Sequence, residues 1–220
     1  MDAVILDWDG TLVDTLGALF RANVAVLATH GLPFDEALYR RHYAPDWRVM
    51  YARLGIPPER LDEANAQWLA HFDGGREIRA FGGVGGALRR LVESGRRLGL
   101  VTAGHREIVE PQLDRTGLGD LLPVRVFGDD LPVHKPDPEP LRVVLRELGL
   151  ADRPEAAVYV GDAPDDMRMA RAVGTGAIGI ASILGDPEEL RAAGASVVVP
   201  SVAAWVDDVL GATPGAPAEP

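Results

Sequence analysis

The chain has no cysteine, a single lysine and few aromatic residues, which make up 6% of its 220 residues. Without cysteine it can form no disulfide, no thiolate metal site and no cysteine nucleophile. No apolar run approaches the roughly 20 residues needed to cross a bilayer, and no signal-peptide pattern develops before Asp7. We therefore expect a cytoplasmic protein, although the lack of cysteine alone would suit either redox compartment.

Positive charge is also scarce. The sequence has 22 basic and 33 acidic side chains, which gives a formal charge of −11. This balance repels nucleic acid and anionic membranes, and no cluster of basic residues reverses it, so we expect neither as a partner. Of the basic residues 21 are arginine, and Lys135 is the one exception. The fractions of hydrophobic residues, 47%, and of charged residues, 25%, are those of a globular chain with a true core.

Short apolar runs recur along the chain, and the first four of them end at aspartate, threonine or glycine. They occupy residues 3–6, 98–101, 124–127, 157–160, 176–180 and 196–199. Between them lie stretches with helical spacing, such as Leu141, Val144, Leu145 and Leu148, which Gly149 closes. Apolar strands that alternate with amphipathic helices predict an α/β fold with a doubly wound parallel sheet, covered by helices on both faces.

Residues 14–82 interrupt this alternation. They contain four helical patterns, at 16–29, 34–43, 47–54 and 58–72, and no convincing strand. We interpret residues 14–82 as an inserted helical domain, with residues 1–13 and 83–211 forming the sheet domain. Paired glycines at 82–83 and 85–86 give a flexible backbone where the chain returns to the core. The last residues, 212–220, are rich in proline, alanine and glycine and are predicted to be a disordered tail.

Chemically active side chains gather where the predicted strands end. In a doubly wound sheet, ligands bind beyond the carboxyl ends of the strands. Six side chains lie at those ends or in the adjoining loops: Asp7, Asp9, Thr102, Lys135, Asp162 and Asp166. Several carboxylates at one place repel one another unless a cation intervenes. A site that offers only oxygen ligands suits Mg²⁺ better than Zn²⁺.

Four short motifs occur in a recognisable order. Residues 7–15 read D-W-D-G-T-L-V-D-T, Thr102 ends a strand, residues 135–138 read K-P-D-P, and residues 161–166 read G-D-A-P-D-D. Together they resemble the signatures of the haloacid dehalogenase superfamily, in its phosphatase form with a helical cap, as in phosphoglycolate phosphatases and β-phosphoglucomutases. Any one motif is weak, but four in order at strand ends are specific. The resemblance covers the whole chain except the tail.

The resemblance implies a role for each residue. Asp7 would be the nucleophile that forms an aspartyl-phosphate, and Asp9 would protonate the leaving alcohol and then deprotonate the attacking water. The metal, Mg²⁺, would be held by Asp7, by Asp162, by the backbone carbonyl of Asp9 and, directly or through water, by Asp166. The phosphoryl oxygens would be bound at a group of three residues: Thr102, Ala103 and Lys135.

The sequence departs from the family pattern at two positions. Ala103 stands where asparagine is common, and Ala163 stands where serine or threonine is common. Both changes remove a polar side chain near the phosphate or the metal. Neither removes an atom that the mechanism needs, so we expect an active enzyme whose supporting contacts come from elsewhere.

Substrate specificity is expected to lie in the helical insert. Arg48, in a polar and aromatic group with His42, Tyr43 and Trp47, is a candidate for binding a substrate anion; the alternative is a solvated helix face with Trp47 in the core. His105, just after Thr102, is a second candidate for contact with the substrate. Thr15 and the neighbouring Asp14 are interpreted as loop or helix-capping residues rather than ligands.

These observations favour a hydrolase of small phosphate monoesters, with a phosphoglycolate-like or sugar-phosphate-like substrate, acting as a monomer or homodimer. Asp9 favours phosphoryl transfer over carbon–halogen cleavage. A phosphomutase of the β-phosphoglucomutase type remains an alternative because it uses the same strand ends. A signalling receiver domain fits poorly, since it has no helical insert. A catalytically dead binding module is disfavoured because the key residues are all present: Asp7, Asp9, Lys135 and Asp162.

Overall fold

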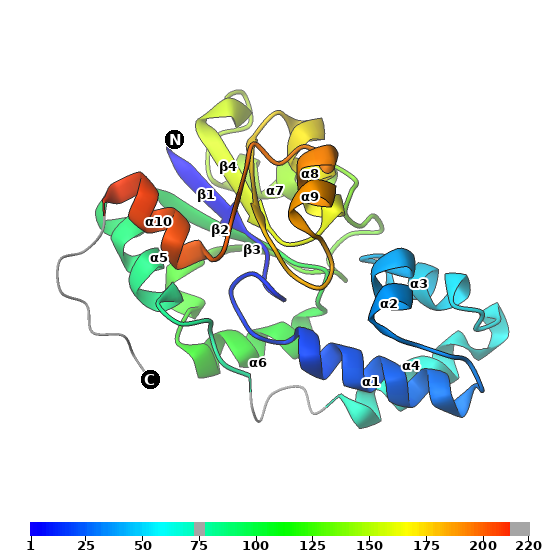
Figure 1. The fold of residues 1–220 in the computed structure, drawn as a ribbon. Helices are drawn as coiled ribbons and strands as arrows, with labels where there is room; N and C mark the ends of the chain where they lie inside the picture. Colours follow the sequence, from blue (N-terminus) through cyan, green and yellow to red (C-terminus); the bar gives the residue numbers. More distant parts are fainter. Residues whose placement is uncertain (73–77, 212–220) are drawn as a thin grey trace.

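The computed structural model describes residues 1–72 and 78–211 and contains a six-stranded, fully parallel sheet (Figure 1). The strand order is β3-β2-β1-β4-β5-β6. The strands are β1 (Ala3–Leu6), β2 (Arg97–Val101), β3 (Val124–Val126), β4 (Ala157–Gly161), β5 (Gly176–Ile180) and β6 (Val197–Val199). The predicted parallel sheet is thereby confirmed, with each strand within one residue of its expected position. The predicted tail, residues 212–220, lies outside the described residues.

Helices cover both faces of the sheet. One face carries α5 (Val84–Glu93), α6 (Arg106–Thr116) and α10 (Val202–Leu210), and the other carries α7 (Glu139–Glu147), α8 (Pro164–Val173) and α9 (Pro187–Ala193). Successive β1 residues alternate between the two apolar clusters, because Val4 packs with the first set of helices and Ile5 with the second. Burial on both faces explains why the strands are continuous apolar runs. Short 3₁₀ turns occur at Pro58–Arg60, Gly119–Leu121 and Pro154–Ala156.

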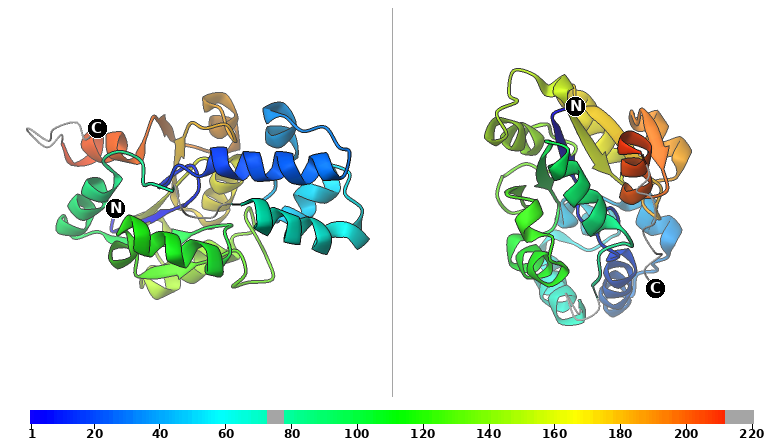
Figure 2. Two further views of the ribbon diagram at one scale, coloured as in Figure 1. Left: turned by 90° about the horizontal axis from the view of Figure 1, so that it is seen from below. Right: turned by 90° about the vertical axis from the view of Figure 1, so that its left-hand side faces the viewer.

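A separate group of helices forms the insert between β1 and α5. It comprises α1 (Leu16–Thr29), α2 (Glu36–His42), α3 (Trp47–Arg53) and α4 (Leu61–His71). Figures 1 and 2 show these helices to one side of the sheet, beyond the carboxyl end of β1. They bury an apolar cluster of their own around Leu27, Met50 and Tyr51, into which Ala163 and Leu184 of the sheet domain also pack. The insert therefore contacts the edge of the sheet where a ligand site is expected.

The two connections to the insert run side by side. The amide of Asp14 donates to the carbonyl of Arg79 at 3.0 Å, and the amide of Phe81 donates to the carbonyl of Leu12 at 3.0 Å. Val13 and Ala80 form an antiparallel bridge between these bonds. The insert thus leaves and rejoins the sheet domain through one paired ladder. Within the described ranges, no helix is long and apolar enough to cross a membrane.

Candidate active site

The acidic site begins in the turn that follows β1. Asp7 directly follows the strand, and Gly10 adopts a left-handed conformation with φ of 73°. A Cβ atom on Gly10 would lie 2.3 Å from Oδ2 of Asp162, which follows β4. Only glycine allows both this backbone conformation and this approach. The glycine of the D-x-D-G motif therefore brings the two adjacent central strand ends into contact.

Lys135 joins two of the carboxylates. Its Nζ atom lies 2.5 Å from Oδ1 of Asp7 and 2.8 Å from Oδ1 of Asp166, and its side chain is only 6% exposed. The other oxygen of Asp166 accepts from the amide of Ala163 at 3.0 Å, at the start of α8. The hydroxyl of Tyr159 lies 3.1 Å from Asp166 Oδ1. Asp166 is therefore held by Lys135, by the amide of Ala163 and by the Tyr159 hydroxyl, whose single proton it shares with the carbonyl of Val101, and it holds Lys135 against Asp7.

Three carboxylates form a cluster that could hold a metal ion. Asp7, Asp162 and Asp166 each place one oxygen so that all three atoms lie within 4.8 Å of one another. Oδ2 of Asp162 accepts a hydrogen bond from Ser182 Oγ at 2.6 Å, which leaves its Oδ1 without a hydrogen-bond donor in the described part of the chain. Such an all-oxygen, multiply charged set matches a hard divalent cation. The oxygens with free capacity belong to Asp7 and Asp162, whereas those of Asp166 already accept from the protein.

The electrostatics of the cluster also fit a cation. Burial raises the pKa of Asp7 to about 7, although Lys135 opposes this rise and Asp166 adds to it. Burial, with the charges of Asp7 and Asp166, raises the pKa of Asp162 well above its ordinary value. For Lys135, burial lowers the pKa, but Asp166 and Asp7 outweigh it and raise the pKa above its usual range. One ammonium cannot balance three buried carboxylates, and a divalent cation would offset the remaining charge.

Asp9 lies in a different environment from Asp7. Its Oδ1 accepts a hydrogen bond from Thr15 Oγ1 at 2.6 Å, and its carboxylate is not part of the three-residue cluster. Burial raises the pKa of Asp9, and the bond from Thr15 opposes the rise. Thr15, interpreted as a loop or helix-capping residue, stands at the N-cap position of α1, but its hydroxyl makes no capping bond to the helix. The same turn thus carries two carboxylates with different partners.

The loop after β2 lies against Asp9. Thr102 is buried, and its Oγ1 accepts from the amide of Gly104 at 3.0 Å. A Cβ atom on Gly104 would lie 3.3 Å from Thr102 Oγ1 and 3.6 Å from Asp9 Oδ2, so these groups surround one point. The N-cap of α6 is His105, not Thr102. The hydroxyl proton of Thr102 thus stays available to a ligand beside Asp9, as does the backbone of Ala103.

Ala163 has a packing role that the sequence did not reveal. Its side chain is 4% exposed and belongs to the apolar cluster of the insert. A serine or threonine here would place a hydroxyl in that apolar contact. The hydroxyl that hydrogen-bonds to the carboxylate of Asp162 comes instead from Ser182, which follows β5. The support for Asp162 thus comes from a different strand end.

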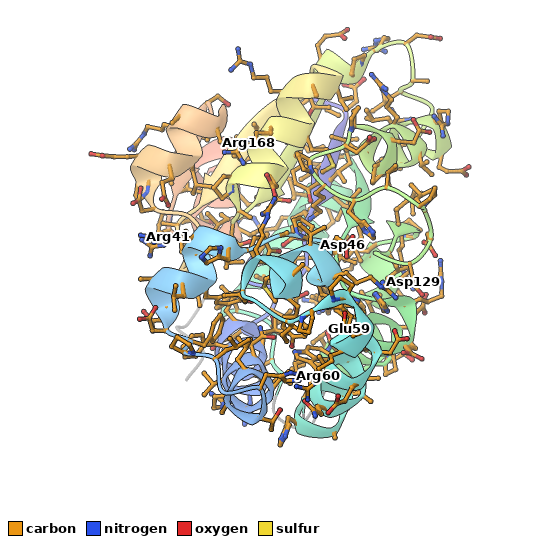
Figure 3. The ribbon with its side chains drawn as sticks, turned by 90° about the vertical axis from the view of Figure 1, so that its right-hand side faces the viewer. Arg41, Asp46, Glu59, Arg60, Asp129 and Arg168 are labelled. Atoms are coloured by element: carbon orange, nitrogen blue, oxygen red, sulfur yellow. The ribbon has the colours of Figure 1, made fainter. Side chains whose placement is uncertain are left out.

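Two cavities flank the site, one on each side of the insert segment 43–45. The smaller, of about 140 Å³, is bordered by Asp9, by residues 103–105 and by the insert. The larger, of about 1150 Å³, is a groove between the insert and α8 and α9, with Lys135 on its lining. Five arginines border this groove: Arg40, Arg41, Arg53, Arg168 and Arg171. Figure 3 shows Arg41, on α2 of the insert, and Arg168, on α8, on the same face of the molecule.

The structure does not bring every predicted residue to the site. His105 borders the smaller cavity, as expected for a substrate contact. Arg48 borders neither cavity; its guanidinium lies over the ring of Trp47, 4.4 Å from the ring centre, and the residue is exposed. The structure therefore does not bring Arg48 to the site, because its side chain packs on the ring of Trp47 and borders neither cavity.

Three contributors to the site were not predicted. Tyr159 lies within β4 and contacts Asp166, Ser182 supports Asp162, and Tyr39 of α2 borders the smaller cavity. Burial, together with Asp9 and Asp162, raises the pKa of Tyr39 above its ordinary range. Ser182 could have been found, since it lies two residues after a predicted strand. Tyr159 and Tyr39 follow from tertiary packing alone.

The fold and the site together define a class: an α/β protein with an acidic, lysine-containing centre at the ends of a parallel sheet, next to a helical insert. A model of the haloacid dehalogenase-like hydrolase family matches residues 4–180. The chain belongs to this family.

Named relatives extend over most of the chain. It is 34% identical to a phosphoglycolate phosphatase of Rhodospirillum rubrum, over 96% of both chains. It is 29% identical to an N-acetylmuramic acid 6-phosphate phosphatase of Pseudomonas aeruginosa, over 80% of this chain and 79% of that one. Among solved structures, CbbY of Rhodobacter sphaeroides in complex with phosphate is similar with a TM-score of 0.74 and 26% identity, covering 92% of this chain and 95% of that one.

Proposed function

We propose that the protein is a phosphatase that hydrolyses small phosphate monoesters with Mg²⁺ through an aspartyl-phosphate on Asp7. The observation that carries this proposal is the contrast between the two aspartates of the first turn. Asp7 is paired with the buried ammonium of Lys135 at 2.5 Å, whereas Asp9 is held apart by Thr15 at 2.6 Å. A nucleophile beside a cation and an acid in its own environment are what two-step phosphoryl transfer requires. The relatives named as phosphatases support the same reaction.

The reaction has two balanced steps. First, a carboxylate oxygen of Asp7 attacks phosphorus and the ester P–O bond breaks, while Asp9 gives its proton to the leaving oxygen. Second, water attacks the aspartyl-phosphate, Asp9 takes its proton, and the bond between phosphorus and Asp7 breaks to release inorganic phosphate. Lys135 and Thr102 would bind the phosphoryl oxygens as their charge changes. Lys135 also lowers the repulsion between the anionic Asp7 and the anionic ester.

The carboxylates of Asp7 and Asp162 and the backbone carbonyl of Asp9 would hold Mg²⁺, with Asp166 as a further support. The fit rests on the cluster of three carboxylates and on the uncompensated negative charge described above. When bound there, the cation would neutralise this charge and polarise the phosphoryl group. Ser182 keeps the carboxylate of Asp162 in place.

The helical insert would act as a cap over the strand ends. Its α2 and α3 border both cavities, and Ala163 and Leu184 of the sheet domain pack into its core. A cap in this place excludes bulk water from the phosphorylated aspartate until the first product has left. The cytoplasmic location and the choice between monomer and homodimer stay predictions.

A phosphomutase would use the same carboxylates. Such an enzyme must hold a sugar that carries phosphates at two positions, and so needs cations to bind the second phosphate. Of the residues 1–72 and 78–211 that border the cavity beside Asp9, none is an arginine or lysine. Hydrolysis, which needs only one phosphoryl site, is therefore favoured.

Release of phosphate from p-nitrophenyl phosphate tests the proposal. The purified protein with Mg²⁺ should turn over, and the Asp7→Asn variant should lose at least about a thousandfold in kcat, since the nucleophile is removed. The Asp9→Asn variant should be slow in both steps, so that acid quenching traps protein-bound phosphate. Asp165→Asn serves as the control, since Asp165, in the motif at residues 161–166, is half-buried and pairs with Arg168 rather than with the acidic cluster. Turnover by Asp7→Asn at the wild-type rate would overturn the covalent mechanism.

A further inference from the structure

The smaller cavity marks where the alcohol half of the substrate binds. The leaving oxygen must lie within reach of Asp9, which protonates it, and Asp9 borders this cavity and not the arginine-lined groove. The loop that would bind the phosphoryl group, residues 102–104, also lies against Asp9. The group attached to the leaving oxygen therefore extends into the space of about 140 Å³ between Asp9 and the insert.

The described residues that border this cavity offer no fixed positive charge. Its walls are aromatic, aliphatic or amide side chains, and His105 is the only basic residue among the described residues that border it. A carboxylate placed there would have no arginine or lysine to pair with among the described residues, and would lie beside the carboxyl group of Asp9. Burying an unpaired charge costs much more than burying a hydrogen-bonded hydroxyl.

The arginines lie on the other side of the insert segment. All five border the larger groove, and Tyr43, Ala44, Pro45 and Leu184 border both spaces and so form the wall between them. A carboxylate only two bonds from the ester oxygen cannot pass this wall. The positive groove can attract anionic esters toward Lys135, but it cannot pair with a charge next to the leaving oxygen.

Neutral polar groups do face the cavity. Asn23 is 3% exposed and borders it, and its Oδ1 accepts from the hydroxyl of Tyr51 at 2.8 Å. The amide nitrogen of Asn23 makes no hydrogen bond with any residue that the structure describes, so its protons can be donated to a ligand. Asn65 of α4 adds a second amide. Amides and phenols of this kind bind hydroxyl groups without requiring charge.

The volume indicates the size of the group that fills this space. An apolar cavity of about 150 Å³ admits benzene, which has six heavy atoms. The space beside Asp9, about 140 Å³, is of that size. A chain of two or three carbons with hydroxyl groups fills it, whereas a larger leaving group would extend through its open side.

We infer, resting on the proposed phosphatase function, that the preferred substrate is the phosphate monoester of a short uncharged polyol. Its free hydroxyl group would accept a hydrogen bond from Asn23. The inferred substrate differs from the one that the name of the Rhodospirillum rubrum relative, a phosphoglycolate phosphatase, gives for that protein. The carboxylate of phosphoglycolate would find no arginine or lysine among the described residues that border this cavity.

Two pairs of compounds test this inference, because each pair differs only by a carboxylate in place of a hydroxymethyl group. The first is 2-hydroxyethyl phosphate and 2-phosphoglycolate; the second is glycerol 3-phosphate and 3-phosphoglycerate. With Mg²⁺ at pH 8, we expect kcat/KM to be at least about tenfold higher for the neutral member of each pair. Equal values, or a preference for the carboxylates, would overturn the inference.

Charge added to the cavity wall gives a sharper test. Asn65→Arg places a cation at the cavity, and Ala66→Arg places the same charge on the exposed side of the same helix. The first variant should raise the ratio of activity on 2-phosphoglycolate to that on 2-hydroxyethyl phosphate by at least about tenfold, and the second should leave the ratio unchanged. The same shift in both variants would mean that the long-range electrostatic field of the protein, and not the lining of the cavity, sets the preference between the two substrates. That result would contradict the inference.

The role of Asn23 has its own matched control. Asn23→Leu removes the amide donor, and Tyr51→Phe breaks the same internal hydrogen bond but keeps that donor. We expect Asn23→Leu to lower kcat/KM for glycerol 3-phosphate about tenfold, as for loss of one buried hydrogen bond, and Tyr51→Phe to lower it much less. Equal losses would remove Asn23 from substrate binding. A failure of the phosphatase proposal would look different, since p-nitrophenyl phosphate and both pairs would then give no turnover.

Discussion

The hydroxyl of Tyr159 lies 3.1 Å from Oδ1 of Asp166, the same oxygen that pairs with Lys135 at 2.8 Å. The side chains of Tyr159 and Asp166 are fully buried, and the ammonium of Lys135 also lies 5.4 Å from the centre of the Tyr159 ring. A residue in the middle of a strand thus fixes the carboxylate that fixes the lysine beside the proposed nucleophile. Tyr159 acts through Asp166 and is a positioning residue rather than a catalytic one.

Replacing Tyr159 by phenylalanine should therefore lower kcat more than it changes KM. The ring and its packing remain, but a hydrogen bond to a charged group is lost, which is worth about 1.5–3 kcal/mol, and part of that loss will be felt in the position of Lys135. We expect kcat to fall about three- to tenfold, with KM within a factor of two. Steady-state kinetics on p-nitrophenyl phosphate measures both values. A change confined to thermal stability would show that the hydroxyl serves only the fold, where it also lies 3.0 Å from the carbonyl of Val101.

Lys135 should not tolerate replacement by arginine. The ammonium is a compact donor that fits between Asp7 and Asp166 in a space where the residue is 7% exposed. A guanidinium is larger and planar and cannot take this position without moving a carboxylate. We expect Lys135→Arg to lose at least about a hundredfold in kcat/KM, nearly as much as Lys135→Met. Circular dichroism would check that both variants are folded, and near-normal activity of Lys135→Arg would show that only charge matters at this position.

Removal of the metal should abolish activity, and Ser182 should affect how tightly the metal binds. Chelation by EDTA should stop turnover and added Mg²⁺ should restore it. Ser182 Oγ lies 2.6 Å from Asp162 Oδ2, and loss of such an outer contact weakens metal binding by about 10- to 100-fold. Ser182→Ala should therefore need at least about ten times more Mg²⁺ for half-maximal activity, with the maximal rate little changed. An Mg²⁺ titration of both proteins decides this, and identical curves would exclude a role for Ser182.

The sheet and its acidic centre could be predicted because β1, β2 and β4 are apolar runs that stop directly before a residue of the site: Asp7, Thr102 and Asp162. Asp7 and Asp162 follow adjacent strands, β1 and β4, so pattern and topology place them together. Which side chains of the helical insert border the cavity could not be predicted in the same way. Arg48 and Trp47 are neighbours on α3, and only packing decides that Trp47 borders the cavity while Arg48 covers its outer face.

Short polar residues near the turn show the same limit. Thr15 satisfies the sequence pattern of a helix cap, and it does stand at the start of α1. Its hydroxyl nevertheless binds Asp9, because the turn at Gly10 folds the first motif back on itself, with Asp9 and Val13 bridged. Local propensity predicts where such a residue stands, whereas its hydrogen-bond partner depends on the path of the loop.

Trp8, between the two aspartates of the first motif, serves stability rather than chemistry. Its side chain is fully buried on the α6 side of the sheet, and its Nε1 donates to Oε1 of Gln112 at 2.6 Å. Trp8→Phe removes this donor from a buried acceptor and should lower the free energy of unfolding by about 2–4 kcal/mol, from the lost hydrogen bond and the smaller ring. Trp47→Phe is the matched control, since Trp47 Nε1 has no acceptor among residues 1–72 and 78–211. Urea unfolding of both variants should give a difference of at least about 1 kcal/mol, and equal losses would show that the bond to Gln112 contributes nothing to stability.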